Sequence, residues 1–311
     1  MDESTSEPLT KFNSLKQALF QDKKGIKLYR NDFINSCISY ADALRVREKP
    51  DVDSMGKKIL EDCGKLKAIR DHLCNWVLLE SAISDENIFS DALVSVLEKL
   101  RELKSRPPEV SNWQDSWFDA HSVFVYESFL YIIAALVKSE AYGVLHEIYT
   151  SHYLLPKSDQ IEQTLFDKFD GFGFYGCSET LNSVLAPENK SLRSPEAELI
   201  KRQADHKDIN FSDIRQADLL SLLMSLIIPG TKWCPSTLYY SNPRDKYNFF
   251  LKATLHKNFL KLAKITGIKT ANELRTKAKQ GYERLNVNEW RISSYSSLWS
   301  LMQMEELDTL K

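Results

Sequence analysis

Residues that form turns are scarce along this chain, and that scarcity constrains the fold more than any other feature. Only ten glycines and ten prolines occur in 311 residues. A β-rich protein of this length needs many tight turns, and tight turns consume glycine and proline. We therefore predict an all-α fold, with an N-terminal helical bundle followed by a larger helical domain that contains a buried central helix.

The N-terminal third shows helical periodicity once its polar start is passed. Residues 1–8 are acidic and polar, and we expect a disordered tail there. Apolar residues then recur every three or four positions, most clearly over residues 59–76. Ser84 is expected to cap the helix that follows. Pro107-Pro108 interrupts the pattern because proline cannot continue a helix, so residues 9–106 are predicted to form an antiparallel four-helix bundle.

Residues 110–311 are predicted to form the C-terminal helical domain. The stretch from Phe118 to Val137 is apolar nearly all round, which is typical of a buried central helix. Thr270 and Glu273 have the spacing of a capping box, and Gly281 is expected to end the helix that they begin. Further helices are expected over residues 141–149, 196–204, 212–227, 243–265 and 295–307.

Charge is distributed unevenly although the whole chain has a net charge of only -2. Residues 244–291 contain twelve basic and four acidic residues, so the remainder of the chain is acidic. Lysines at positions 257, 261 and 264 follow the spacing of one helix face. Such a stripe can be a solvated surface, can contact acidic groups of this chain or of a partner, or can neutralise phosphates of a nucleic acid. The candidate phosphate- or partner-binding residues are Arg244, Lys246, Lys257, Lys261, Lys264 and Lys269.

The cysteines and the length of the apolar runs suggest in which cellular compartment the protein resides. The five cysteines are widely spaced and odd in number, which fits a reducing compartment better than a disulfide framework. The longest apolar run, near residues 131–137, falls far short of the ~20 residues that cross a bilayer. We expect a cytoplasmic protein that does not contact a membrane.

Three short motifs suggest chemistry, and each has a simpler explanation. Gly171-Phe-Gly-Phe-Tyr-Gly176 spells GxGxxG, but it lacks the preceding strand and following helix that bring a pyrophosphate onto a helix N-terminus. Arg202 and His206 are spaced more closely than in the HEPN-type ribonuclease pattern. Cys63, His72 and Cys74 fall on one predicted helix rather than in the paired ligand loops of a zinc site. We therefore predict no catalytic residue, no cofactor and no metal ligand.

The segment from Trp233 to Tyr240 is expected to be conformationally special and extended. Pro235 cannot serve a central strand, and the bulky aromatic residues Trp233 and Tyr239 lie on either side of it. The simpler reading is that these residues close the core between two helices.

Four stretches carry a family resemblance. They are residues 122–137, 142–156, 214–220 and 233–240. Together, over about residues 110–269, they resemble a helical region found downstream of TIR-type or sirtuin-type domains in bacterial anti-phage defence proteins. The resemblance implies that the helical part senses, oligomerises or scaffolds, while a separate N-terminal domain performs the chemistry. The first part of this chain has no alternating strand and helix pattern, so no catalytic residue of such a domain has a counterpart here.

These observations favour one function and leave another open. The first expectation is a non-catalytic interaction, sensor or scaffold protein of a bacterial anti-phage system, which would present an apolar groove and the basic segment to an effector or trigger protein. The alternative is a nuclease, a nucleotide-processing enzyme or a nucleic-acid-binding module that uses residues 244–291.

Overall fold

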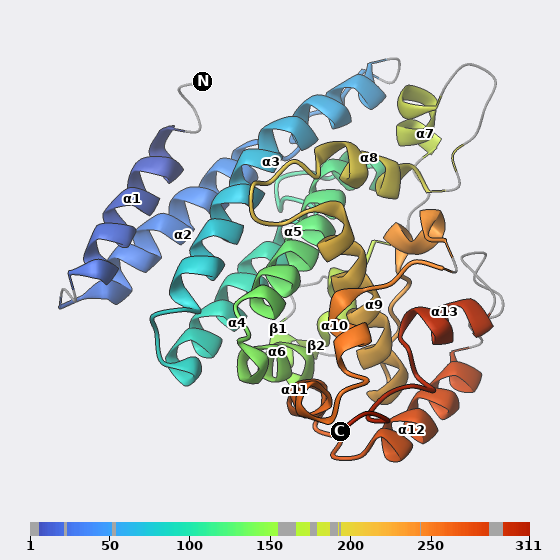
Figure 1. The fold of residues 1–311 in the computed structure, drawn as a ribbon. Helices are drawn as coiled ribbons and strands as arrows, with labels where there is room; N and C mark the ends of the chain where they lie inside the picture. The colour runs from blue at the N-terminus through green and yellow to red at the C-terminus, as the bar shows by residue number, and fades with distance from the viewer. Residues whose placement is uncertain are drawn as a thin grey trace.

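The computed structural model confirms the all-α prediction (Figure 1). The structure describes residues 6–21, 24–51, 54–154, 166–174, 179–186, 192, 194–242, 244–285 and 295–311. The first helices are α1 (Ser6–Phe20), α2 (Ile26–Ala43), α3 (Met55–Glu80), α4 (Glu86–Glu102), α5 (Asp119–Lys138) and α6 (Tyr142–Thr150). The later helices are α7 (Glu179–Leu185), α8 (Pro195–Gln203), α9 (Phe211–Ile227), α10 (Asn248–Lys252), α11 (His256–Thr266), α12 (Ala271–Arg284) and α13 (Tyr295–Leu301).

Short elements link these helices. The 3-10 turns are η2 (Asp115–Phe118), η3 (Phe169–Phe172) and η4 (Ser236–Tyr240). Two short strands, β1 (Tyr153–Leu154) and β2 (Phe166–Asp167), pair antiparallel. Helix α1 begins at Ser6, so residues 6–8 are helical rather than part of the expected tail, while residues 1–5 lie outside the described residues.

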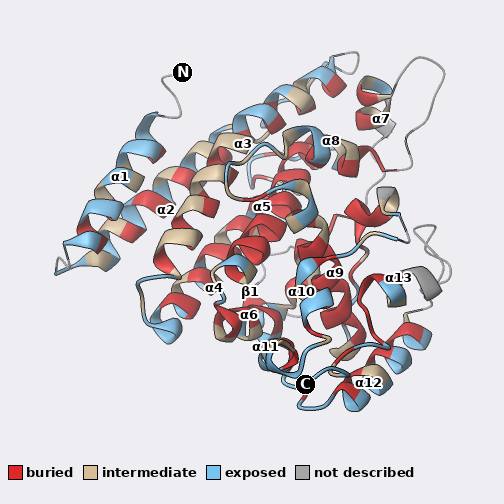
Figure 2. Cartoon of the chain, viewed as in Figure 1, coloured by how far each residue is buried: buried red, intermediate tan, exposed pale blue. Residues whose placement is uncertain are grey.

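The helix α5 lies at the centre of the fold, as its apolar sequence predicts. Figure 2 shows it buried along most of its length. The stretch from Asp115 to Lys138 is long and apolar enough to cross a membrane, yet 89% of its most apolar window is buried inside the protein. Packing against other helices therefore accounts for its composition.

Helices on either side of Pro107-Pro108 share one core. The proline pair follows the end of α4, as expected, but α3 packs along α5 more extensively than any other two elements of the described chain. Arg70 of α3 and Glu127 of α5 form a buried ion pair, and the Arg70 guanidinium lies 4.0 Å from the centre of the Tyr131 ring. The N-terminal and C-terminal parts predicted from the sequence are therefore joined by a continuous interior.

Capping differs in detail from the sequence prediction. Asp85, not Ser84, caps α4, because its carboxylate accepts the backbone N–H of Asn87 at 2.9 Å. The Ser84 hydroxyl instead donates to Glu80. Thr270 caps α12 as predicted, accepting the backbone N–H of Glu273 at 3.3 Å. Gly281 does not end that helix but lies inside it.

The single helix expected over residues 243–265 is wrong for the described residues, which form α10 and α11 with a break between them. The C-terminal strap, residues 303–311, forms hydrogen bonds with backbone groups at this break. The N–H of His256 donates to the carbonyl of Leu310 at 2.8 Å, and the N–H of Leu310 donates to Thr254 at 2.9 Å. The helix expected over residues 295–307 ends at Leu301, where the chain turns to form the strap.

We expect Arg275→Ala to loosen the C-terminal strap. The Arg275 side chain donates to the carbonyls of Met304 at 2.6 Å and Leu307 at 2.9 Å. Loss of these charge-assisted hydrogen bonds should lower the free energy of unfolding by about 2 kcal/mol. Limited proteolysis should then cleave the strap faster. The matched control Lys277→Ala removes only a surface pair with Glu273 and should change both measurements little. Equal behaviour of the two variants would contradict the role given to Arg275.

Candidate functional site

A buried carboxylate network joins α5, α9 and η4. Asp218 of α9 is fully buried. Its Oδ1 accepts the indole N–H of Trp233 at 2.7 Å, and its Oδ2 accepts the hydroxyl of Tyr126 at 2.9 Å. Thr237 donates to Oδ2 twice, from its backbone N–H at 2.9 Å and from its hydroxyl at 2.6 Å. The network ties α5, α9 and η4 together.

Burial raises the pKa of the Asp218 carboxyl from 3.8 to about 6, and the donors of Thr237, Trp233 and Tyr126 oppose that rise. Both carboxylate oxygens accept hydrogen bonds from groups that hold the fold together, so we assign Asp218 a structural role. Asp218 is not among the candidate residues predicted from the sequence. The signal was an aspartate inside the leucine-rich run of α9, since a lone acid on a buried helix needs partners.

The predicted special segment takes part in this network but is not extended. Trp233 is fully buried, in contact with the Asp218 carboxylate and with Tyr126, whose ring centre lies 5.6 Å away. Pro235 precedes the 3-10 turn η4, and Tyr239 lies within that turn, half-buried. The extended stretch expected over residues 233–240 is therefore a turn that closes the core.

The basic segment divides between exposed side chains and ion pairs within this chain. Lys261 pairs with Glu140 at 2.7 Å and Lys264 pairs with Glu86 at 3.1 Å. Two of the three lysines in the predicted stripe thus meet acidic groups from elsewhere in the protein. A phosphate would have to compete with these carboxylates.

The remaining candidate residues of the basic segment lie at the surface. Lys246 donates to the side chain of Gln303 at 3.1 Å. Arg244, Lys257 and Lys269 are exposed. The role of these six residues in binding a phosphate or a partner therefore stays a prediction.

The glycine motif is a packing loop in its described part, residues 171–174. Lys104 donates to the carbonyls of Gly171 at 3.0 Å and Gly173 at 2.7 Å, so the loop binds an internal cation rather than an anion. Phe172 stacks on Phe129 with ring centres 4.8 Å apart. Gly176 lies outside the described residues.

The other two motifs are separated in space or committed to packing. Arg202 pairs with Glu198 at 2.9 Å, whereas the His206 ring lies edge-on to Tyr131. Cys63 and Cys74 are buried on α3, and burial raises the pKa of both thiols. No group of three metal-ligating side chains was found among the described residues.

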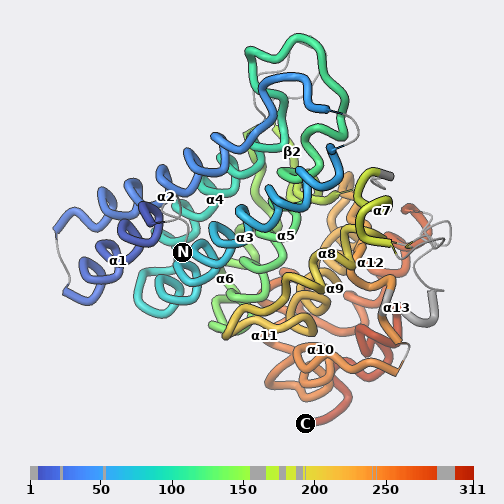
Figure 3. Tube along the Cα trace, turned by 90° about the horizontal axis from the view of Figure 1, so that it is seen from above, coloured from blue at the N-terminus to red at the C-terminus, as the bar shows by residue number. Residues whose placement is uncertain are grey.

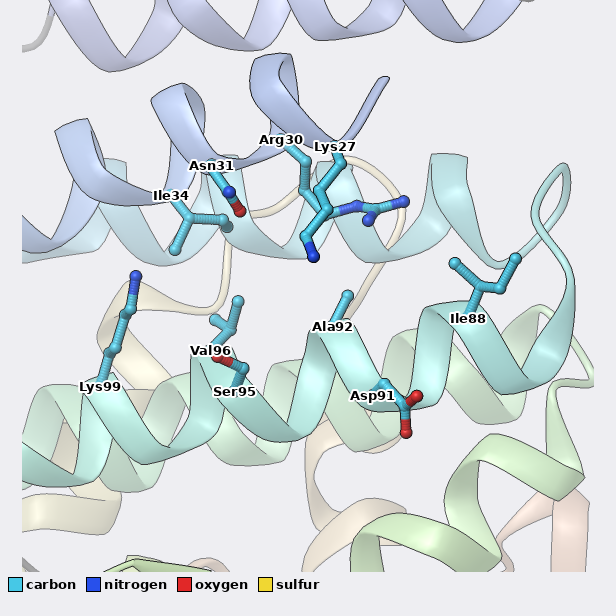
Figure 4. A pocket seen from close by; sticks show the side chains of 10 residues that line it. All are labelled: Lys27, Arg30, Asn31, Ile34, Ile88, Asp91, Ala92, Ser95, Val96 and Lys99. Atoms are coloured by element: carbon cyan, nitrogen blue, oxygen red, sulfur yellow. The ribbon is translucent and has the colours of Figure 1, made fainter. Parts of the chain in front are cut away.

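A groove lies between α2 and α4 (Figure 4). It encloses about 310 Å³. Each wall is one helix face, with residues spaced three or four apart. The α2 wall is made by Lys27, Arg30, Asn31 and Ile34, and the α4 wall by Ile88, Asp91, Ala92, Ser95, Val96 and Lys99.

The groove has an apolar floor and a rigid support. Ile34 and Val96 are only 3% and 4% exposed at its base, whereas Ile88 at one end is 60% exposed. Arg30 is held from behind by the buried Glu80, with 2.8 Å between Nε and Oε1. The Trp76 indole also donates to Glu80. Because both partners are fixed, the Arg30 stem forms a stable part of the wall.

Cations dominate the rim of the groove. Figure 4 shows the side chain of Lys27 projecting from α2 toward α4, and that of Lys99 projecting from α4 toward α2. Arg30 is already paired with Glu80, and Lys99 donates to Asn35 at 2.9 Å. Lys27 makes no hydrogen bond or ion pair within the described chain. Among the described residues, Asp91 is the one acidic residue that lines the groove, so this part of the rim is positive on balance.

Comparison with known proteins identifies no relative. No protein-family model, no curated protein and no solved structure matches this chain.

Proposed function

We propose that this protein is a non-catalytic helical interaction protein that binds an acidic amphipathic segment of a partner in the groove between α2 and α4. The observation that carries the proposal is the combination of an apolar floor at Ile34 and Val96 with lysines at the rim. An amphipathic helix places apolar side chains into such a groove and keeps its polar face in water.

The dimensions of the groove support a helical occupant. Its α4 wall runs from Ile88 to Lys99, which spans roughly 16 Å at ~1.5 Å per residue. A helix of about three turns matches that length and can present apolar residues at positions i, i+3 or i+4, and i+7. Acidic residues on its flanks would meet Lys27 at one wall and Lys99 at the other.

The wider role follows from the resemblance of residues 110–269 to helical regions of anti-phage defence proteins. We propose that the partner is a separate effector or trigger protein of such a bacterial system and that both act in the cytoplasm. In this scheme the C-terminal helices provide the scaffold, and the α2–α4 groove receives the partner.

A designed peptide tests the groove directly. The probe is an acidic amphipathic helix of about four turns, with leucines on one face and glutamates beside them, labelled for fluorescence anisotropy. We expect it to bind the protein. A peptide with the same leucines and lysine flanks should not bind. The variant Lys27→Glu/Lys99→Glu should weaken the acidic peptide roughly tenfold, because two rim charges are reversed.

The control is Lys57→Glu, which reverses an exposed lysine on α3 away from the groove. It should leave peptide affinity unchanged. If the acidic peptide does not bind, or if Lys57→Glu weakens it as much as the groove variant does, the proposed binding mode is incorrect.

A photo-cross-linking residue at Ser95 tests the partner in the native host. Ser95 is exposed and lines the groove, so a bound segment would lie within reach of the label. One protein should be captured from position 95 and not from position 57, and its cross-linked peptide should carry an acidic amphipathic sequence. Equal capture from both positions would contradict the proposal.

A further inference from the structure

A second pocket shares no lining residue with the α2–α4 groove and is polar rather than apolar. It encloses about 360 Å³ where the end of α5, the start of α9, and helices α10 and α11 meet. Figures 1 and 3 both place α9, α10 and α11 together. Five lining residues come from the basic segment, at positions 248, 249, 252, 258 and 261. This pocket is independent of the proposed partner groove.

Several amide and ammonium groups that line the pocket have no partner among the described residues. Within the described residues, the side chains of Asn248, Asn258 and Lys252 make no hydrogen bond or ion pair, although all three line the pocket. Gln216 is positioned by one contact, in which its Oε1 accepts the backbone N–H of Phe249 at 2.8 Å. Its side-chain amide N–H groups make no bond there. Carboxamides with a free donor and acceptor can pair with the edge of a heterocycle.

An aromatic pair contributes flat apolar surface beside these amides. The rings of Tyr142 and Phe249 lie 6.0 Å apart at an angle of 35°. Phe249 is half-buried, so part of its ring remains accessible. Any of the nucleobases can stack on an accessible aromatic ring.

The charges of the pocket leave one ammonium group for an anion. Lys261 is paired with Glu140, and Lys138 donates to the carbonyl of Asp208. The carboxylate of Asp213 accepts the backbone N–H of Asn210 at 3.0 Å in the capping box of α9. Lys252 is exposed and uncommitted, so it can meet a phosphate.

We infer that this pocket binds a nucleoside monophosphate, with the base against Phe249 and among the amides, and the phosphate on Lys252. The volume is near the lower end of the roughly 300–1,000 Å³ found for small-molecule sites. Phosphate alone would leave the amides and the ring unused. A nucleoside alone would leave Lys252 unused.

Calorimetric titration of the full-length protein with each common nucleoside monophosphate tests the inference. We expect at least one to bind. Inorganic phosphate and the matching nucleoside, titrated separately, should each bind at least about tenfold more weakly, because each satisfies only part of the pocket. Lys252→Gln should weaken the nucleotide roughly tenfold or more, and Asn258→Ala should also weaken it.

The matched control is Lys257→Gln, which removes an exposed lysine of α11 that does not line the pocket. It should leave nucleotide affinity unchanged. Failure of every monophosphate to bind at millimolar concentration overturns the inference. Phosphate binding as tightly as the nucleotide, or a nucleotide affinity that Lys252→Gln does not alter, also overturns it. Peptide binding at the α2–α4 groove is measured separately, so failure of one site does not imply failure of the other.

Discussion

Asp218→Ala is expected to lower the free energy of unfolding by about 4 kcal/mol. The substitution leaves the indole N–H of Trp233 and the backbone N–H of Thr237 buried without an acceptor. A buried donor that loses its partner keeps its full desolvation cost. Chemical denaturation followed by circular dichroism measures the change.

Thr237→Val provides the graded control for Asp218. It removes only the hydroxyl that donates to Asp218 and leaves the backbone N–H in place, so it should cost about 1 kcal/mol. If Asp218→Ala lowers the free energy of unfolding by less than the about 1 kcal/mol expected for Thr237→Val, the carboxylate does not anchor η4 to α9.

The pH dependence of this anchor has a definite sign. Burial raises the pKa of Asp218 from 3.8 to about 6, so the folded protein binds a proton there more tightly than the unfolded chain does. The stability that this proton adds is fully present below pH 3.8 and is lost as pH rises through about 6. The stability difference between the native protein and Asp218→Asn, which does not titrate, should therefore shrink by about 3 kcal/mol from pH 3.5 to pH 7. A difference that grows with pH would contradict this assignment.

Gly281→Ala is expected to destabilise the protein by about 3 kcal/mol or more. A Cβ at Gly281 would lie 1.8 Å from the backbone carbonyl oxygen of Leu226, where α12 crosses the end of α9. Backbone cannot rotate away as a flexible side chain can, so the two helices must separate. The hydrogen bonds that the Arg284 side chain donates to the carbonyls of Ser225 and Ile228 would weaken as well. Thermal and chemical unfolding both measure the effect.

Gly64→Ala is the matched control for the helix-packing prediction. Gly64 also lies inside a helix, α3, but nothing lies within 4 Å of the position its Cβ would occupy. Alanine there should stabilise the protein by about 1 kcal/mol, because glycine costs conformational entropy in a helix interior. Similar gains in stability from both substitutions would indicate that helix propensity, rather than the contact with α9, governs position 281.

Helices with a strong periodic pattern could be predicted from the sequence. The apolar face of α3 and the all-round apolar composition of α5 are local properties, and both helices form where the pattern places them. Thr270 could be identified as a cap because the capping hydrogen bond joins residues only three positions apart. Local hydrogen bonds and local spacing depend on few residues, so the sequence reports them directly.

Features that depend on distant residues could not be predicted in this way. The break between α10 and α11 is stabilised by backbone hydrogen bonds to the C-terminal strap, which no local pattern reveals. Glycine is typical of a helix C-cap, but Gly281 is needed for a different reason. The backbone of Leu226 lies so close that a Cβ would not fit at this position.

The two candidate binding sites show the same division. The spacing of Lys27, Arg30, Asn31 and Ile34 on α2 is visible in the sequence, but the groove exists because α4 lies opposite this face. Likewise, the sequence places Lys261 and Lys264 on one helix face, while their pairing with Glu140 and Glu86 depends on how the helices pack. By itself, the sequence determined the helical class, the central helix and the stretch of basic charge, because each follows from local composition and period. The tertiary structure decided which charges are neutralised and which faces stay open, since those outcomes depend on contacts between residues far apart in the chain.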